Sequence, residues 1–217
     1  MVQINGIVNE YIHVEKPDQE AVPSRQFDIS KIDFDLLSRE FAHTRQKNLL
    51  LRDLDELVNQ QLAKMLFANP QRIDYYDRYQ EIIDAYNAEQ NRATIEKTFM
   101  DLMELASSLD TEQQRYVREG FSSDEELSVY DLLFSEKLTK QEIETIKKVS
   151  VDLLTKIKQQ IAKLDHWTDK QETKAIVDNL IRNTLWQELP NSYDVSDIQT
   201  YQKKIYEYVY MRYPEVA

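Results

Sequence analysis

Apolar residues recur every three or four positions along most of the chain from Asp33 onward, and this period constrains the fold more than any other feature. Such spacing gathers apolar side chains on one face of an α-helix. The repeating positions are Phe34, Leu37 and Phe41; Leu51, Leu54, Val58, Leu62 and Met65; Ile95, Phe99, Leu102 and Ala106; Ile143, Ile146, Leu153, Ile157, Ile161 and Leu164; Ile176, Leu180, Ile181, Leu185 and Leu189; and Ile198, Tyr201, Ile205, Tyr208 and Val209. Only 2 glycines and 5 prolines are present, too few for an all-β chain with many tight turns. We expect an all-α fold, an irregular bundle of roughly eight helices joined by short connections.

Residues suited to capping helix N-termini stand before several of these stripes. Three pairs have the spacing of a capping box, in which Ser or Thr is followed three positions later by Glu or Gln: Ser123 and Glu126, Thr139 and Glu142, and Thr168 and Gln171. Asp74 and Thr94 are placed to cap two further helices. We therefore expect a helix to start at each of these five places.

Other residues mark where helices should end. Pro70 and Pro190 each follow an apolar stripe, and proline does not continue a helix. Gly120 is placed to close a short helix that begins near Thr111, because glycine accepts the left-handed backbone at a helix C-terminus. The last helix should cover residues 197–213.

The first thirty residues differ from the rest because they lack the helical period and contain Pro17 and Pro23. This pattern predicts an extended N-terminal arm or linker over residues 1–30. A helical domain should then occupy residues 31–217, with an internal division into two sub-bundles that meet near residues 119–124 as one arrangement of it.

Composition restricts the class of protein. The chain has 217 residues with 41% hydrophobic content, enough to bury a core. It has no cysteine, which excludes disulfides and thiolate zinc sites, and we find no apolar run that could act as a signal peptide or membrane span. We expect a cytoplasmic protein with no membrane partner. Its net charge of -12 opposes nonspecific binding to nucleic acid, so any DNA contact must be local.

A search for catalytic motifs finds none. A phosphate-binding loop of the form GxxxxGK[ST] cannot be written, because Gly6 and Gly120 are the only glycines. Glu172 and Lys174 are the nearest match to the acid and lysine of a metal-dependent nuclease, but residues two apart point away from each other on a helix. No histidine has a second ligand at metal-binding spacing; the three are His13, His43 and His166. We predict no catalytic, metal or cofactor site in this chain.

Lysines collect in the helix expected after Thr139 and just beyond it, at Lys147, Lys148, Lys156, Lys158 and Lys163. They could contact a DNA backbone or an acidic partner. The alternative, which we favour, is an ordinary exposed face whose lysine stems cover the edge of the core.

Aromatic residues raise the same question. Tyr76, Tyr79, Ile83 and Tyr86 fall on one side of a helix. Because base stacking would require exposed tyrosines on a positive surface, we favour core packing for them and equally for both tryptophans, Trp167 and Trp186. Asp74 and Arg78, four apart, should pair on the exposed side of the tyrosine helix.

Several separated segments resemble the C-terminal part of the restriction, or motor, subunit of type I restriction-modification enzymes. They are "IDFDLLSREF", "NPQRIDYYDRYQEIIDAYN", "QRYVREGFSSDEELSVYDLL", "LDHWTDKQETKAIVDNLIRNTLWQELP" and "YEYVYMRY". The resemblance covers nearly the whole chain after about Phe27. It implies that this chain is a fragment of a much longer subunit, which carries a nuclease domain and two helicase lobes ahead of this region.

The resemblance also implies a role. The family's full subunit is an ATP- and Mg-dependent DNA translocase and site-specific deoxyribonuclease that works with methyltransferase (modification) and specificity subunits, and reaches DNA through the whole assembly. Its helical C-terminal region is associated with docking onto that core. For this chain the resemblance implies an assembly module that is no enzyme and binds no cofactor itself. The alternatives are an auxiliary DNA-binding module that uses the lysine-rich helix, and a generic helical protein-interaction domain.

Overall fold

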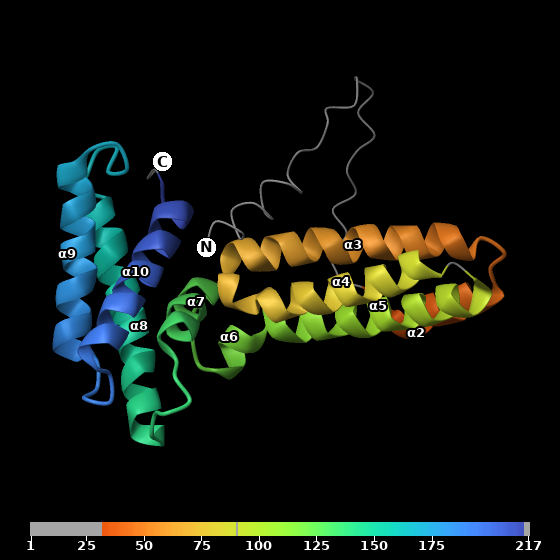
Figure 1. The fold of residues 1–217 in the computed structure, drawn as a ribbon, viewed down its shortest axis with the longest axis horizontal. Coiled ribbons are helices and arrows are strands. Elements are labelled where there is room, and N and C mark those ends of the chain that lie inside the picture. Colours follow the sequence, from red (N-terminus) through yellow and green to blue (C-terminus); the bar gives the residue numbers. More distant parts are fainter. Residues whose placement is uncertain (1–31, 90, 215–217) are drawn as a thin grey trace. The chain divides into compact units, whose positions relative to one another are not determined.

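The computed structural model describes residues 32–89 and 91–214, and these form helices joined by short connections (Figure 1). The helices are α2 (Phe34–His43), α3 (Lys47–Ala68), the 3-10 turn η2 (Pro70–Arg72), α4 (Ile73–Ala88), α5 (Arg92–Gln113), α6 (Arg115–Arg118), α7 (Asp124–Leu133), α8 (Lys140–Ile161), α9 (Gln171–Glu188) and α10 (Val195–Arg212). Within the described ranges no strand occurs, so the predicted all-α fold is confirmed. The predicted arm over residues 1–30 lies outside the described residues.

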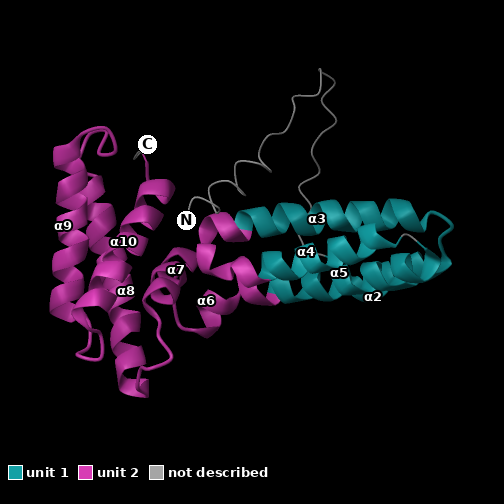
Figure 2. Ribbon diagram, viewed as in Figure 1, with its two compact units in different colours: residues 1–64, 75–110 teal, residues 65–74, 111–217 magenta. Residues whose placement is uncertain are grey.

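The chain divides into two compact units (Figure 2). Unit 1 comprises residues 1–64 and 75–110, and unit 2 comprises residues 65–74 and 111–217. Helices α3, α4 and α5 belong mainly to unit 1 and contribute their ends to unit 2. The domain boundaries inferred from the sequence, at residue 30 and near residues 119–124, stay predictions.

Unit 1 is built from long helices whose apolar stripes face each other. The rings of Phe41 and Phe99 stack with their centroids 3.6 Å apart, and both side chains are buried. Tyr79 is also buried, and its hydroxyl donates to Asp55 Oδ1 at 2.8 Å. Core packing is thus confirmed for the central tyrosine of the α4 stripe. Its neighbour Arg78 pairs with Glu104 of α5 at 2.9 Å, so the expected pairing with Asp74 is wrong.

Unit 2 has the larger core, formed where α7, α8, α9 and α10 pack together. Its fully buried members include Leu133, Ile146, Leu153, Ile157, Val177, Ile181, Leu185, Ile205 and Val209. Trp167 is buried as predicted; its indole Nε1 donates to the carbonyl of Tyr213 at 2.6 Å. The packing prediction for Trp186 is wrong, since this side chain is 49% exposed. It directly follows the core residue Leu185, and one step along a helix turns a side chain by about 100°.

A cluster of buried and half-buried polar groups, most of them charged, joins η2, the end of α5, α6 and α7 in unit 2. Its members, here called the buried charge cluster, are Asn69, Arg72, Glu112, Arg115, Asp124 and Asp131. The guanidinium of Arg72, whose side chain is 4% exposed, donates to Asp124 at 2.6 and 3.0 Å and to Glu112 at 3.0 Å. Burial raises the pKa of the Asp131 carboxyl although Arg115 and Asn69 oppose the shift. Every charge in the cluster has a charged partner, as burial requires.

Two predicted helix boundaries of unit 2 are confirmed in detail. Thr139 and Glu142 form a complete capping box at the start of α8. Gly120 follows α6 with φ +84°, in the left-handed region that glycine adopts without strain. Ser123 caps α7 by accepting from the Glu126 N–H at 3.3 Å, while Glu126 accepts from the Ser122 N–H instead of closing the box.

Other predicted starts are wrong. Asp74 lies within the first turn of α4, because the chain enters that helix directly from η2, whose cap is Asn69. Asn91, one turn before Thr94, accepts the Thr94 N–H at 3.0 Å and starts α5. That helix then continues through residue 111 to Gln113 without a new start.

The start of α9 differs from its prediction for a tertiary reason. The Thr168 hydroxyl donates to the carbonyl of Pro214 at 3.2 Å, and α9 begins after Lys170 without a side-chain cap. The last helix starts earlier than expected, at Val195, where Asp194 and Asp197 form a capping box that the sequence pattern did not single out.

Candidate functional site

The lysines of α8 lie at two different edges of the core. Lys147 donates to the carbonyl and to the carboxylate of Glu119, both at 3.1 Å, and lies over the rings of Phe121 and Tyr130. Lys158, eleven positions later and therefore on the same side of the helix, pairs with Glu125 of α7. These two ammonium groups are held by carboxylates of unit 2.

Lys156 faces the opposite edge of the same helix. Its Nζ lies 2.6 Å from Asp152 and 2.6 Å from Glu188 at the end of α9. Lys148 and Lys163 are exposed and, within the described part of the chain, pair with no carboxylate. The five lysines therefore form no single positive surface, although contact of these residues with DNA or a partner stays a prediction.

The residues considered for catalysis do not converge either. Glu172 is exposed at the start of α9, and the Lys174 ammonium lies 5.6 Å from the centre of the Tyr210 ring. His43 is exposed in the last turn of α2, His166 lies in the α8–α9 connection, and His13 is outside the described residues. No group of three acidic or imidazole side chains suited to a metal ion occurs among the residues that the structure describes.

The outward side of α9 carries a row of four exposed uncharged residues, flanked by the exposed charges of Glu172 and Arg182. Ile176, Asn179, Asn183 and Trp186, here called the α9 face, follow a three-four-three spacing and are all exposed. Ile176 is 42% and Trp186 is 49% exposed, whereas Val177, the next residue to Ile176, is in the core. Exposed tryptophan is unusual on a surface that has no partner, and it is enriched among the residues that dominate protein interfaces. The α9 face is thus the candidate docking surface of unit 2.

Sequence reasoning missed the α9 face because it assigned Ile176 and Trp186 to the core. The signal was nevertheless present. Val177, Ile181 and Leu185 repeat every four positions and account for one buried stripe, which leaves the residues at 176 and 186 on the other side of the helix.

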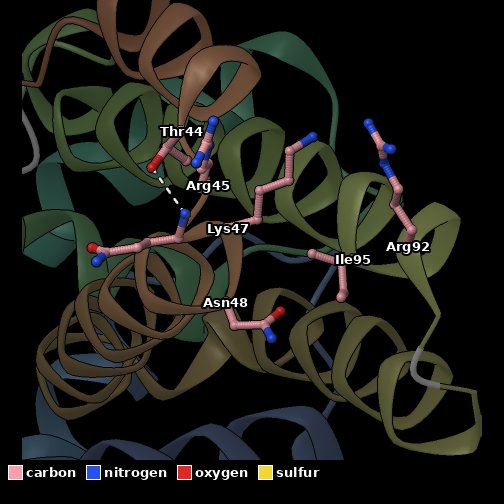
Figure 3. Close-up of a pocket in the computed structure, with 7 residues that line it drawn as sticks. Thr44, Arg45, Lys47, Asn48, Arg92 and Ile95 are labelled. Atoms are coloured by element: carbon pink, nitrogen blue, oxygen red, sulfur yellow. Dashed lines mark hydrogen bonds between the residues drawn. The ribbon is translucent and has the colours of Figure 1, made fainter.

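Unit 1 contains a pocket of about 450 Å³ at the start of α3 and α5 (Figure 3). Residues 44–48 line it together with Arg92 and Ile95. Thr44 Oγ1 accepts the Gln46 N–H at 3.1 Å and shapes the short connection between α2 and α3. The pocket contains three cationic side chains, Arg45, Lys47 and Arg92, none of which the sequence analysis singled out.

One carboxylate faces two of these cations. Glu96 Oε1 lies 2.6 Å from Lys47 Nζ and 3.2 Å from Arg92 Nε. The hydrogen bond from Lys47, supported by Arg92, holds the pKa of the Glu96 carboxyl below its ordinary value, so it stays ionised. Arg45 is exposed and, among the described residues, pairs with no carboxylate.

Comparison with known proteins supplies a family. Over residues 17–213 the chain matches the family described as type I restriction enzyme HindI endonuclease subunit-like, C-terminal. The match includes every described helix and confirms the resemblance noted in the sequence segments. The comparisons with curated proteins and with solved structures found no match.

Proposed function

The chain belongs to the family of C-terminal regions of HindI-like type I restriction endonuclease subunits, and from this premise we propose that it is an assembly module. In this proposal it holds the endonuclease subunit on the methyltransferase and specificity core. The observation that carries the proposal is the α9 face, a row of uncharged residues with an exposed tryptophan in a chain of net charge -12.

The α9 face has the physical properties of a docking surface. Burying a tryptophan against a partner removes roughly 150–250 Å² of surface from water. Asn179 and Asn183 can exchange hydrogen bonds with water for bonds with a partner, so these two side chains bring no charge that must be desolvated. Helix α9 is fixed by its buried stripe against α8 and α10, so little conformational entropy is lost on binding.

The proposal assigns chemistry to other parts of the parent subunit. This chain contributes binding, and it neither cleaves DNA nor binds ATP or Mg²⁺; those activities belong to the longer subunit. Its partners are the methyltransferase and specificity subunits, with DNA reached through the whole assembly, in the cytoplasm. No helix in the described ranges has an apolar stretch long enough to cross a lipid bilayer.

The test is a pull-down of the 217-residue chain with the purified methyltransferase–specificity core. The double variant Ile176→Ala/Trp186→Ala should weaken binding by about tenfold or more, because truncated interface tryptophans typically cost at least ~2 kcal/mol. Met100→Ala in unit 1 is the matched control, since it also truncates an exposed apolar side chain, 55% exposed, on a helix.

Two outcomes would contradict the proposal at different levels. Full-strength binding by the double variant would remove the α9 face from the interface. Failure of the unmodified chain to bind the core at all would remove the assembly function itself.

A further inference from the structure

The pocket of unit 1 has a surplus of positive charge. Arg45, Lys47 and Arg92 supply three positive charges and Glu96 one negative charge, so the pocket carries 3 − 1 = 2 positive charges. The whole chain has a net charge of -12. The local surplus is therefore opposite in sign to the protein's overall charge. By contrast, Lys147, Lys156 and Lys158 of α8 are each neutralised by a carboxylate of unit 2.

The cations come from separate parts of unit 1 and meet at one opening. Arg45 stands in the α2–α3 connection, Lys47 begins α3 and Arg92 begins α5. Figure 3 shows the three side chains extending toward the same side of the pocket, with Ile95 between Lys47 and Arg92. The Arg92 side chain is 85% exposed, so its guanidinium can rotate to meet a ligand.

The two helix starts add to this charge. The first backbone N–H groups of a helix have no acceptor within it, and the helix dipole places partial positive charge there. The first turns of α3 and α5 both lie at the pocket. Oxyanions are favoured at such positions when cationic side chains are also present.

We propose that this pocket binds the phosphodiester backbone of duplex DNA. Guanidinium groups such as those of Arg45 and Arg92 donate two parallel hydrogen bonds to a phosphate, and backbone contacts of this kind position a protein on DNA without reading sequence. The open form of the pocket suits a group on a continuous strand, and the chain's family is that of a restriction endonuclease subunit, whose substrate is DNA.

Glu96 has a defined part in the proposal. Its carboxylate holds Lys47 and Arg92 in place when DNA is absent, and it competes with phosphate for the same two cations. Replacing it with glutamine should therefore tighten DNA binding. A carboxylate with a purely structural role would give the opposite result or none.

Filter binding of a short duplex by the 217-residue chain, repeated between about 50 and 200 mM salt, tests the pocket. The double variant Arg45→Glu/Arg92→Glu should bind about tenfold more weakly, with a salt slope reduced by roughly 1–2, because one or two phosphate contacts are lost. The control is Arg52→Glu/Lys64→Glu, which reverses two exposed charges of α3 in unit 1 and leaves the pocket intact. Circular dichroism verifies that both variants remain helical.

The outcomes separate cleanly. A selective loss in the pocket variant, with tighter binding by Glu96→Gln, supports the proposal. Equal effects of the two double variants, or no DNA binding by the unmodified chain at the lowest salt, would overturn it. Binding of inorganic phosphate is measured with the same variants. If the pocket variant loses phosphate binding while the salt slope of its DNA binding is unchanged, the pocket holds a free anion and the DNA proposal fails.

Discussion

The two units differ in how exposed and how fully paired their arginine side chains are. In unit 2, the Arg72 side chain is 4% exposed and directs its donors to Glu112 and Asp124 inside the protein. In unit 1, the Arg92 side chain is 85% exposed and shares the single carboxylate of Glu96 with Lys47. The first arrangement links elements of one unit, and the second leaves positive charge facing solvent. The number of basic residues in a segment therefore does not locate a binding surface; the position of their carboxylate partners does.

The largest expected effect tests the buried member of this comparison. Arg72→Ala removes a buried guanidinium, leaves the partly buried Asp124 without a cation and leaves Glu112 with Arg115 alone, which should lower the free energy of unfolding by about 3–5 kcal/mol. Arg92→Ala should lower it by no more than about 0.5 kcal/mol, because exposed ion pairs contribute little. Urea unfolding followed by far-UV circular dichroism measures both. Similar losses of unfolding free energy in the two variants would contradict the difference between buried and exposed arginines.

A smaller effect compares two tyrosine hydroxyls. Tyr193 donates to the buried carbonyl of Leu133 at 2.6 Å in unit 2, and Tyr79 donates to the half-buried carboxylate of Asp55 at 2.8 Å in unit 1. Tyr193→Phe should cost about 1–3 kcal/mol because the carbonyl is left without a partner away from water. Tyr79→Phe should cost about 0.5–1.5 kcal/mol, since water can reach Asp55. A larger loss for Tyr79→Phe in denaturant unfolding would reverse the expected order.

The smallest effect concerns acid stability. Burial raises the pKa of the Glu125 carboxyl, but Lys158, Tyr213 and Arg212 together outweigh it, and the folded pKa is below the ordinary value of 4.5. A lowered folded pKa stabilises the protein above pH 4.5, and this contribution is lost as the pH falls through the folded value. In unit 1, Lys47 and Arg92 lower the pKa of Glu96 as well, so its contribution to stability depends on pH in the same direction.

Glu125→Gln should therefore be less stable than the unmodified chain near neutral pH, and the difference should shrink on acidification. Glu96→Gln should show the same trend more weakly, because the Glu96 side chain is 43% exposed against 26% for Glu125, and solvent screens its pairs more. Urea midpoints between about pH 6 and pH 3 measure both variants. A Glu125→Gln difference that grows toward acid pH would show that the sign is wrong.

Local sequence predicts the helices well and their first residues less well. A cap is specified by a side chain that reaches an N–H two or three positions ahead, so Asn91 and Thr94 both satisfy the rule and sequence alone does not choose between them. Thr168 satisfies it as well, yet its hydroxyl is used by Pro214, which is 46 residues away. Contacts of that range follow from the packed structure and leave no local pattern.

The candidate surfaces show the same limit. The α8 lysines stand out in the sequence, but the carboxylates that neutralise them, Glu119, Glu125 and Glu188, are 28 to 33 residues away along the chain. The pocket joins Arg45 and Lys47 to Arg92, which lies 45 to 47 residues later on another helix. Only folding brings these groups together. The α9 face was within reach of sequence reasoning, because its opposite stripe already accounted for the core.

The two tryptophans are the only ones in the chain, and both belong to unit 2. The indole of Trp167 is buried and packs edge-on against the rings of Tyr206 and Tyr210, whereas that of Trp186 meets water. The tryptophan fluorescence of the protein therefore contains no signal from unit 1 and two separable signals from unit 2. Trp167 emission should shift to longer wavelength only when the core opens, and Trp186 emission should shift to shorter wavelength when the α9 face is covered. The protein thus contains its own optical reporters of unfolding and of docking.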